Sequence, residues 1–232
     1  MTFGADEALD LLDWKRQVFT LYEQVRASSD PRSAWELWRE TRDRLFREHL
    51  QSPLPAERRA DFPGCRYFEY DPRARVLGRV EPCEPVHCNV LASTGAEFPF
   101  SKVGTARFTL DGEEHSLALL WNEGYGGGLF VSYQDESSGR ETYPGARYLL
   151  DTVKGADLGT NRSLLVLDFN FAYNTSFAYD SSWACPLAPP ESRLSVSVRA
   201  GEQAPSKAIV VDALTGLART ANGQQTSEIE LS

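Results

Sequence analysis

The sequence is poor in cysteine and histidine, and it contains no long hydrophobic run. Its four cysteines, Cys65, Cys83, Cys88 and Cys185, are too sparse in 232 residues to build a disulfide scaffold. No apolar stretch approaches the roughly 18 residues that a membrane-spanning helix needs. The acidic segment 1–13 lacks the basic and apolar parts of a secretory signal. These absences predict a cytoplasmic protein with reduced thiols and no membrane partner.

Positive charge is also in short supply, which argues against nucleic acid as a partner. Lys and Arg number 24 against 33 Asp and Glu, for a net charge of −9. A negative protein repels phosphate backbones unless its basic residues cluster. Six arginines do fall between residues 39 and 59, but acidic residues alternate with them, which is typical of a solvated helix face with ion pairs. We therefore expect no nucleic-acid partner.

The apolar content, 41% of residues, is enough to bury the core of one folded domain. The N-terminal part indicates two helices. Apolar residues recur at helical spacing from Leu9 to Val25. Asp30 and Pro31 then form the cap and first residue of a second helix, which ends before Pro53. The aromatic face of this second helix predicts packing against the rest of the domain.

From Cys65 onward the apolar period changes to two, which predicts β-strands. No helices alternate with these strands, so a parallel sheet is excluded. The predicted fold is mainly β, an antiparallel β-sandwich or partly closed barrel with two N-terminal α-helices over one side or one open end. The expected strands are residues 66–70, 75–81, 86–92, 106–110, 116–121, 129–134, 147–150, 164–170 and 194–199.

The chain is expected to have three parts. An N-terminal helical segment, residues 1–55, packs on a β-rich main domain, residues 56–202. A C-terminal extension, residues 203–232, follows. It contains an apolar stretch at 208–213, which suits a late strand, and a polar end rich in Gln, Thr and Ser, which predicts partial disorder.

Two segments, residues 134–148 and 168–187, carry more polar and aromatic residues than a β-scaffold requires. Together with the opening segment 38–54, they resemble a bacterial and archaeal family known as a domain of unknown function, DUF1684, over roughly residues 35–202. The resemblance implies membership of a group but no activity. The motifs that carry it include Glu141-Thr142-Tyr143, Arg147-Tyr148-Leu149, Asp168-Phe169-Asn170, Tyr173-Asn174, Cys185-Pro186-Leu187 and Ala200-Gly201-Glu202.

The chain departs from the family pattern at five positions. Thr175, Ser176 and Phe177 stand where the pattern has Pro, an aromatic residue and Cys. Leu50 replaces a Pro, and Ser192 replaces an Asn. A mechanism that needs a thiol at position 177 is therefore not open to this chain. Either that thiol lies outside the shared chemistry of the family, or this member has diverged in function.

Asp168 and Glu141 are the candidate catalytic residues. A carboxyl group serves as a general acid or base when partial burial raises its pKa toward neutrality. Asp168 follows the apolar run 164–167, so a strand carries it from the core to the rim of the sheet. The same position also suits a turn cap, or an ion pair with Arg147 inside the sheet.

A second set of residues suits a polar pocket with aromatic walls that binds a substrate. Arginine offers a planar fork for an anion, and Tyr and Asn offer oriented hydrogen bonds. The same residues equally suit a buried network that pins two loops to the sheet. The set consists of Asp135, Arg147, Tyr148, Asn170, Tyr173, Asn174 and Tyr179.

No pattern indicates a metal or a cofactor. Cys83, His87 and Cys88 lie close together, but their spacing matches no standard zinc motif, and strand alternation points His87 and Cys88 to opposite faces. The glycines at 126–128 precede a strand rather than a helix, so they do not match a nucleotide-binding loop. We expect no cofactor, no bound zinc and no disulfide.

Two functional hypotheses follow. The first is a metal-independent enzyme, either a hydrolase or a lyase/isomerase, that acts on a small polar metabolite. In this enzyme, Asp168 and Glu141 exchange protons with the metabolite, and Arg147 holds an anion. The second is a non-catalytic module that binds a ligand or a partner protein through the same pocket. Two carboxylates in one cleft beside Arg147 favour the enzyme, and separate closed networks favour a scaffold. Substrate and oligomeric state stay open.

Overall fold

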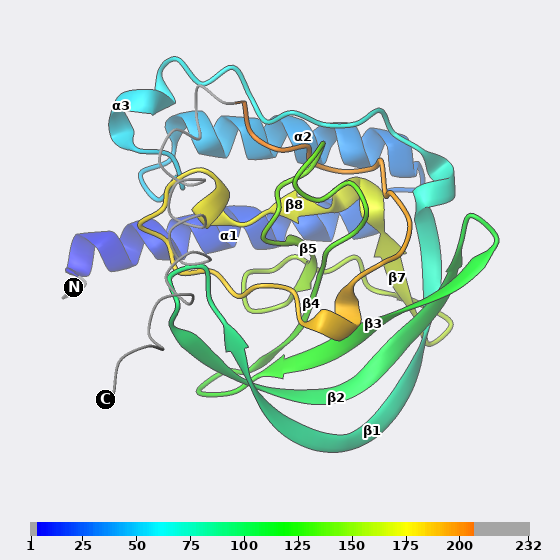
Figure 1. Ribbon diagram of the computed structural model, residues 1–232. Coiled ribbons are helices and arrows are strands. Elements are labelled where there is room, and N and C mark those ends of the chain that lie inside the picture. Colours follow the sequence, from blue (N-terminus) through cyan, green and yellow to red (C-terminus); the bar gives the residue numbers. More distant parts are fainter. Residues whose placement is uncertain (1–3, 207–232) are drawn as a thin grey trace, which may run out of the picture.

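Two long helices form a hairpin at the start of the chain, and a curved β-sheet follows (Figure 1). The computed structural model describes residues 4–206. Helix α1 spans Ala5–Ala27 and helix α2 spans Pro31–Glu48. Asp30 caps α2, because its carboxylate accepts hydrogen bonds from the backbone N–H groups of Arg32 and Ser33, both at 3.2 Å. The two predicted helices are confirmed.

The sheet is an eight-stranded antiparallel half barrel in the order β6-β7-β1-β2-β3-β4-β5-β8. Its long strands β1, β2 and β3 curl strongly at the bottom of Figure 1. The predicted class, mainly β with two N-terminal helices, is confirmed. The strands span Arg75–Leu91 (β1), Glu97–Leu110 (β2), Glu113–Asn122 (β3), Gly128–Tyr133 (β4), Arg147–Asp151 (β5), Thr160–Asn161 (β6), Leu164–Asp168 (β7) and Tyr173–Asn174 (β8).

Short helical turns connect these elements. Helix α3 spans Ala56–Arg59 and follows the hairpin. The remaining turns are 3-10 helices at Pro72–Ala74, Phe169–Phe171, Ser176–Ala178 and Pro190–Ser192.

The structure differs from the predicted strands in several respects: β2 begins earlier than predicted, β7 ends at Asp168, and β6 and β8 were not predicted. Residues 75–81 and 86–92 belong to one continuous strand, β1, whose pairing with β2 shifts in register between Pro82 and Val86. A proline cannot donate to the ladder, so the strand bends there without ending. Residues 66–70 and 194–199 form no strand. Isolated bridges, Tyr67 with Glu202 and Gln134 with Arg193, hold these segments instead.

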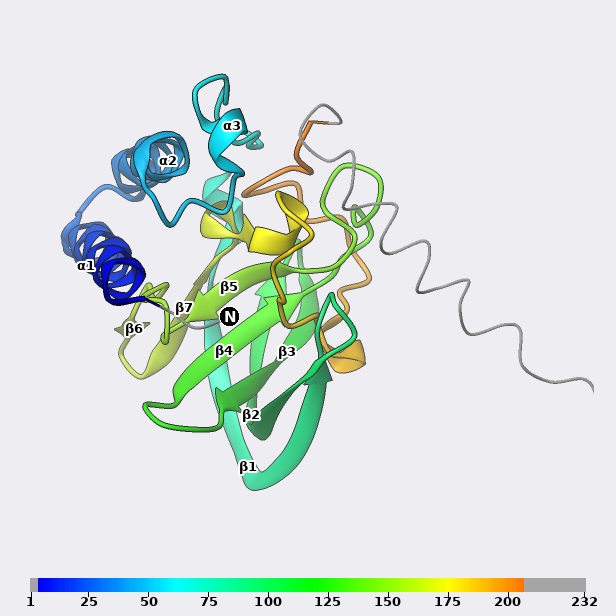
Figure 2. The ribbon, with the colours of Figure 1, turned by 90° about the vertical axis from the view of Figure 1, so that its left-hand side faces the viewer.

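The helical hairpin covers one open side of the half barrel (Figure 2). Trp35 and Trp38 are each 2% exposed, as the aromatic face of the second predicted helix implied. The Trp38 ring lies edge-on to that of Phe171, with centroids 5.4 Å apart. The Trp35 indole N–H donates to the carbonyl oxygen of Asn170 at 3.0 Å. These contacts fix the helices against the segment after β7. The predicted C-terminal extension lies outside the described residues from position 207 onward.

Candidate functional site

A cavity of about 400 Å³ lies between α1 and the part of the sheet formed by β5 and β8. We call it the helix cavity. Its wall is mainly apolar and aromatic, which is typical of small-molecule sites. Helix α1 contributes Leu11, Trp14, Lys15, Val18 and Tyr22. The other lining residues are Phe46, Gln51, Pro53, Tyr148, Val153, Lys154, Ala156, Tyr173, Asn174, Thr175, Ser176, Trp183, Ala184 and Cys185.

A second cavity of about 200 Å³ adjoins the first. The two cavities share Tyr148, Val153, Lys154 and Ala184 in their walls. Three phenylalanines, from β2 and β4, give the second cavity an apolar floor; they are Phe98, Phe100 and Phe130. A molecule in the helix cavity therefore has adjacent apolar space into which it can extend.

Within the part of the chain that the structure describes, the charged side chains that line the helix cavity have one sign. Lys15 and Lys154 are the charged residues in its wall, although the chain as a whole carries a net charge of −9. Asp151, in the wall of the second cavity, lies 3.8 Å from the Lys154 ammonium group. Burial raises the pKa of Asp151, and the nearby Lys154 opposes that shift. The two lysines therefore give the described wall of the helix cavity a positive charge.

Three of the predicted binding residues line the helix cavity: Tyr148, Tyr173 and Asn174. The rings of Tyr148 and Tyr173 meet edge to face, with centroids 5.7 Å apart. The Tyr148 hydroxyl donates to the carbonyl oxygen of Pro186 at 2.7 Å. Burial raises the pKa of both tyrosines well above the ordinary value, so both phenols are neutral. The structure thus brings three of the predicted binding residues to one cavity wall, and their role in binding stays a prediction.

Asp168 and Asn170 belong to a different place. The Asp168 carboxylate accepts a hydrogen bond from the Arg75 guanidinium at 3.0 Å and another from the Asn170 backbone N–H at 3.1 Å. The Asn170 side chain in turn bonds both backbone groups of Asp71, at 2.7 and 2.9 Å. Neither Asp168 nor Asn170 is among the residues that line the two cavities. The sequence reasoning also offered an ion pair between Asp168 and Arg147. That alternative is wrong, because Asp168 pairs with Arg75.

Arg147 and Asp135 form a second closed network, on the C-terminal segment of the domain. The Arg147 guanidinium donates to Asp135 at 2.5 Å. It also donates to the carbonyl oxygens of Val198 at 2.9 Å and Ala200 at 2.5 Å. Asp135 accepts further hydrogen bonds from the backbone and hydroxyl of Ser137. Arg147 is 2% exposed and Asp135 1%, so the fork that was expected to hold an anion is fully occupied by the protein itself.

Glu141 lies at the surface, apart from Asp168. Its carboxylate pairs with Arg199 at 2.9 Å, and its side chain is 40% exposed. Surface ion pairs of this kind contribute little stability. The two predicted catalytic carboxylates therefore have separate partners, and the structure shows no hydrogen bond that links either of them to Arg147.

Tyr179 leads to a network that the sequence reasoning missed. Its hydroxyl donates to the carboxylate of Glu202 at 3.2 Å, and the Asn174 backbone N–H donates to the same oxygen at 2.6 Å. The Arg42 guanidinium, from α2, also binds this carboxylate. Glu202 is fully buried. The sequence signal for this network was the family motif Ala200-Gly201-Glu202, because an acid that is buried there needs a basic partner.

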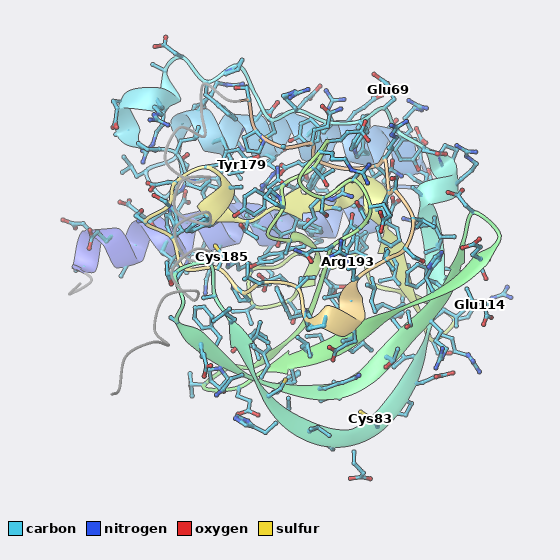
Figure 3. All side chains as sticks on the ribbon, in the orientation of Figure 1. Glu69, Cys83, Glu114, Tyr179, Cys185 and Arg193 are labelled. Carbon is cyan, nitrogen blue, oxygen red and sulfur yellow. The ribbon has the colours of Figure 1, made fainter. Side chains whose placement is uncertain are left out.

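The cysteines and histidines form no metal centre in residues 4–206, where no three metal-binding side chains gather. All four cysteines are free thiols. Cys83 lies on β1 where its pairing with β2 shifts in register, and apart from Cys185 (Figure 3). His87 pairs with Glu123 at 3.0 Å, and Cys185 lies in the wall of the helix cavity.

The fold and the cavity define a half-barrel β-domain closed by a helical hairpin. The chain belongs to the family described as protein of unknown function (DUF1684), whose profile matches residues 60–203. It is similar to the solution NMR structure of an uncharacterized protein from Haloarcula marismortui, at 35% identity and a TM-score of 0.54, over 74% of this chain and 92% of that chain. No curated protein matches the chain. None of the described helices is long and apolar enough to cross a membrane.

Asp168→Asn tests whether this carboxylate is part of the architecture. Thermal unfolding at pH 7 is expected to change by only a few degrees. Burial raises the pKa of Asp168, so its ionised form is disfavoured in the folded state, and the amide removes that cost while it still accepts from Asn170. Arg75, which loses its partner, has a side chain that is 36% exposed and can be solvated.

The same variant gives a pH dependence with a defined sign. The folded protein binds a proton at Asp168 more tightly than the unfolded chain, so the wild type gains stability as pH falls through the folded pKa. The difference between the two thermal unfolding midpoints, variant minus wild type, should therefore be more positive at pH 7 than near pH 4. A loss of well over about 10 °C at pH 7 would mark Asp168 as an essential half of its ion pair.

Proposed function

We propose that the protein binds a small amphipathic molecule, with an apolar body and one anionic group, in the helix cavity. The observation that carries the proposal is the combination of an aromatic wall with two lysines, which are the only charged residues in that wall among residues 4–206. Apolar burial supplies affinity, and Lys15 and Lys154 supply preference for an anion.

The expected acid–base enzyme has less support. It requires Asp168 and Glu141 beside Arg147 in one cleft, yet the first is buried against Arg75 and the second is exposed against Arg199. Separate closed networks are the arrangement that favours a scaffold. We therefore propose the non-catalytic alternative, which is ligand binding. Its pocket is the helix cavity rather than the region around Arg147.

A pair of fluorescent probes tests the proposal. Anilinonaphthalene sulfonate carries a permanent negative charge, and phenylnaphthylamine is its uncharged relative. Both are expected to bind, and Lys154→Gln or Lys15→Gln should weaken the sulfonate by about 3- to 10-fold, which corresponds to about 1 kcal/mol for a partly screened charge. The uncharged probe should bind all three proteins alike.

Two further variants complete the test. Lys102→Gln removes a lysine that is paired with Glu191 and is absent from both cavity walls, so it should not change sulfonate binding. Ala184 is exposed and lines both cavities, so Ala184→Trp should block both probes. Binding that survives Ala184→Trp unchanged would place the probe elsewhere and refute the proposal.

A further inference from the structure

A row of four aromatic rings crosses the sheet along the walls of both cavities. The rings of Tyr173 and Tyr148 have centroids 5.7 Å apart, and the ring of Phe130 follows at 4.8 Å from that of Tyr148. Phe100 ends the row, with its ring centroid 5.4 Å from that of Phe130. The four residues come from β8, β5, β4 and β2, which follow one another across the sheet with only β3 between the last two. The row is therefore elongated in one direction.

The strand register places this row on the face of the sheet that the cavities occupy. Residues directly opposite each other in a pair of antiparallel strands share a face. Tyr148 lies opposite Tyr173 in the sheet, and Phe100 lies opposite Asn122. Tyr173 lines the helix cavity, and Tyr148 lines both cavities. Phe100 and Asn122 line the second cavity. The aromatic wall of the helix cavity thus continues into the second cavity.

Positive charge lies toward one end of this row. Lys15 lines the helix cavity and is absent from the wall of the second. The Lys154 ammonium group lies 6.0 Å from the centroid of the Tyr148 ring, in the wall that the two cavities share. Beyond Tyr148, the second cavity has its phenylalanine floor, and its acidic residue, Asp151, is paired with Lys154 at 3.8 Å. The helix cavity therefore suits an anionic end, and the second cavity suits an apolar chain.

We propose that the bound molecule is a straight-chain fatty acid. Its carboxylate lies near Lys15 and Lys154, and its chain passes Tyr148 and ends over the phenylalanines of the second cavity. This inference rests on the proposed function and narrows its ligand to a class. An elongated chain follows the row of rings, whereas a compact acid with the same number of carbons buries less of the apolar surface in the second cavity.

A series of straight-chain acids from hexanoate to dodecanoate tests the inference, with affinities measured by competition with anilinonaphthalene sulfonate. In the wild type, each added CH₂ that becomes buried should tighten binding by about 3- to 4-fold. Asn122→Trp places an indole in the second cavity, so the affinity should stop rising at a shorter chain while hexanoate binds as in the wild type. Lys154→Gln should weaken every acid by the same factor, because it acts on the carboxylate.

Asn89→Trp is the matched control, because it makes the same substitution at an exposed residue of the sheet. Asn89 lies opposite Pro99, so its side chain is on the other face from that of Phe100, and it lines neither cavity. This variant should keep the wild-type dependence on chain length. Adamantane carboxylate, a compact acid with as many carbons as undecanoate, should bind more weakly than undecanoate to the wild type and be unaffected by Asn122→Trp.

Three results would overturn the inference. The first is an affinity that does not rise with chain length in the wild type, and the second is a rise that Asn122→Trp leaves unchanged. The third is an equal loss of adamantane carboxylate and dodecanoate in Asn122→Trp, which would reflect a general disturbance of the site. In each case, a sulfonate probe that Lys154→Gln weakens would still support the proposed function. If no acid and neither probe binds, both proposals fail.

Discussion

Arg147→Met is expected to lower the free energy of unfolding by about 3–5 kcal/mol, the usual cost of breaking a buried ion pair. The methionine fills similar space but leaves the carboxylate of Asp135 buried without its counter-ion. It also leaves the carbonyl oxygens of Val198 and Ala200 without their donor. The thermal unfolding midpoint should fall by on the order of 10 °C for a domain of this size, as measured by circular dichroism.

A double-mutant cycle separates the charge from the packing. Asp135→Asn removes the stranded charge, and its amide oxygen still accepts from Ser137. In the Arg147→Met background, this second change should cost less than it does alone. Glu141→Gln, at an exposed ion pair, is the control and should shift stability by no more than about 1 kcal/mol. An Arg147→Met protein as stable as the control would refute the structural role.

The elements that the sequence predicted best depend on local signals. Asp30 and Pro31 mark the start of α2, and the helix begins there. Apolar runs at 117–120, 129–131 and 148–150 mark β3, β4 and β5, which are largely buried strands. Residues 194–199 alternate in sequence but form no strand. Their backbone bonds to Gln134 and Glu136 at isolated points, and the Arg147 side chain binds the carbonyl oxygen of Val198. Periodicity alone does not reveal which partner a segment finds.

Two residues that the sequence reasoning placed in one pocket lie apart in the structure, and the separation has a physical reason. Arg147 and Tyr148 are neighbours on β5, so their side chains point to opposite faces of the sheet. Tyr148 lines the helix cavity, and Arg147 faces the C-terminal segment. Assigning both to one pocket ignored that alternation. Lys15 could not be predicted at all, because its place depends on how α1 packs across the half barrel.

Glu202→Gln is expected to be the other strongly destabilising change, again by about 3–5 kcal/mol. The groups around this buried carboxylate are all donors: the Arg42 guanidinium, the Asn174 backbone N–H and the Tyr179 hydroxyl. A glutamine amide has one acceptor and one donor atom, so its NH₂ group must face a donor. Arg42 also loses its counter-ion while it is held over the ring of Tyr173.

Glu202→Gln should weaken ligand binding as well as lower the stability of the fold. Glu202 holds the backbone of Asn174, so a loosened carboxylate network should weaken sulfonate binding at temperatures where the variant is still folded. Tyr179→Phe is the matched control, because it removes one donor and leaves the charge pair, at a cost of about 1 kcal/mol. Thermal unfolding and probe titration are measured on both variants. If Glu202→Gln unfolds within about 2 °C of the control, the buried acid does not hold this wall of the cavity.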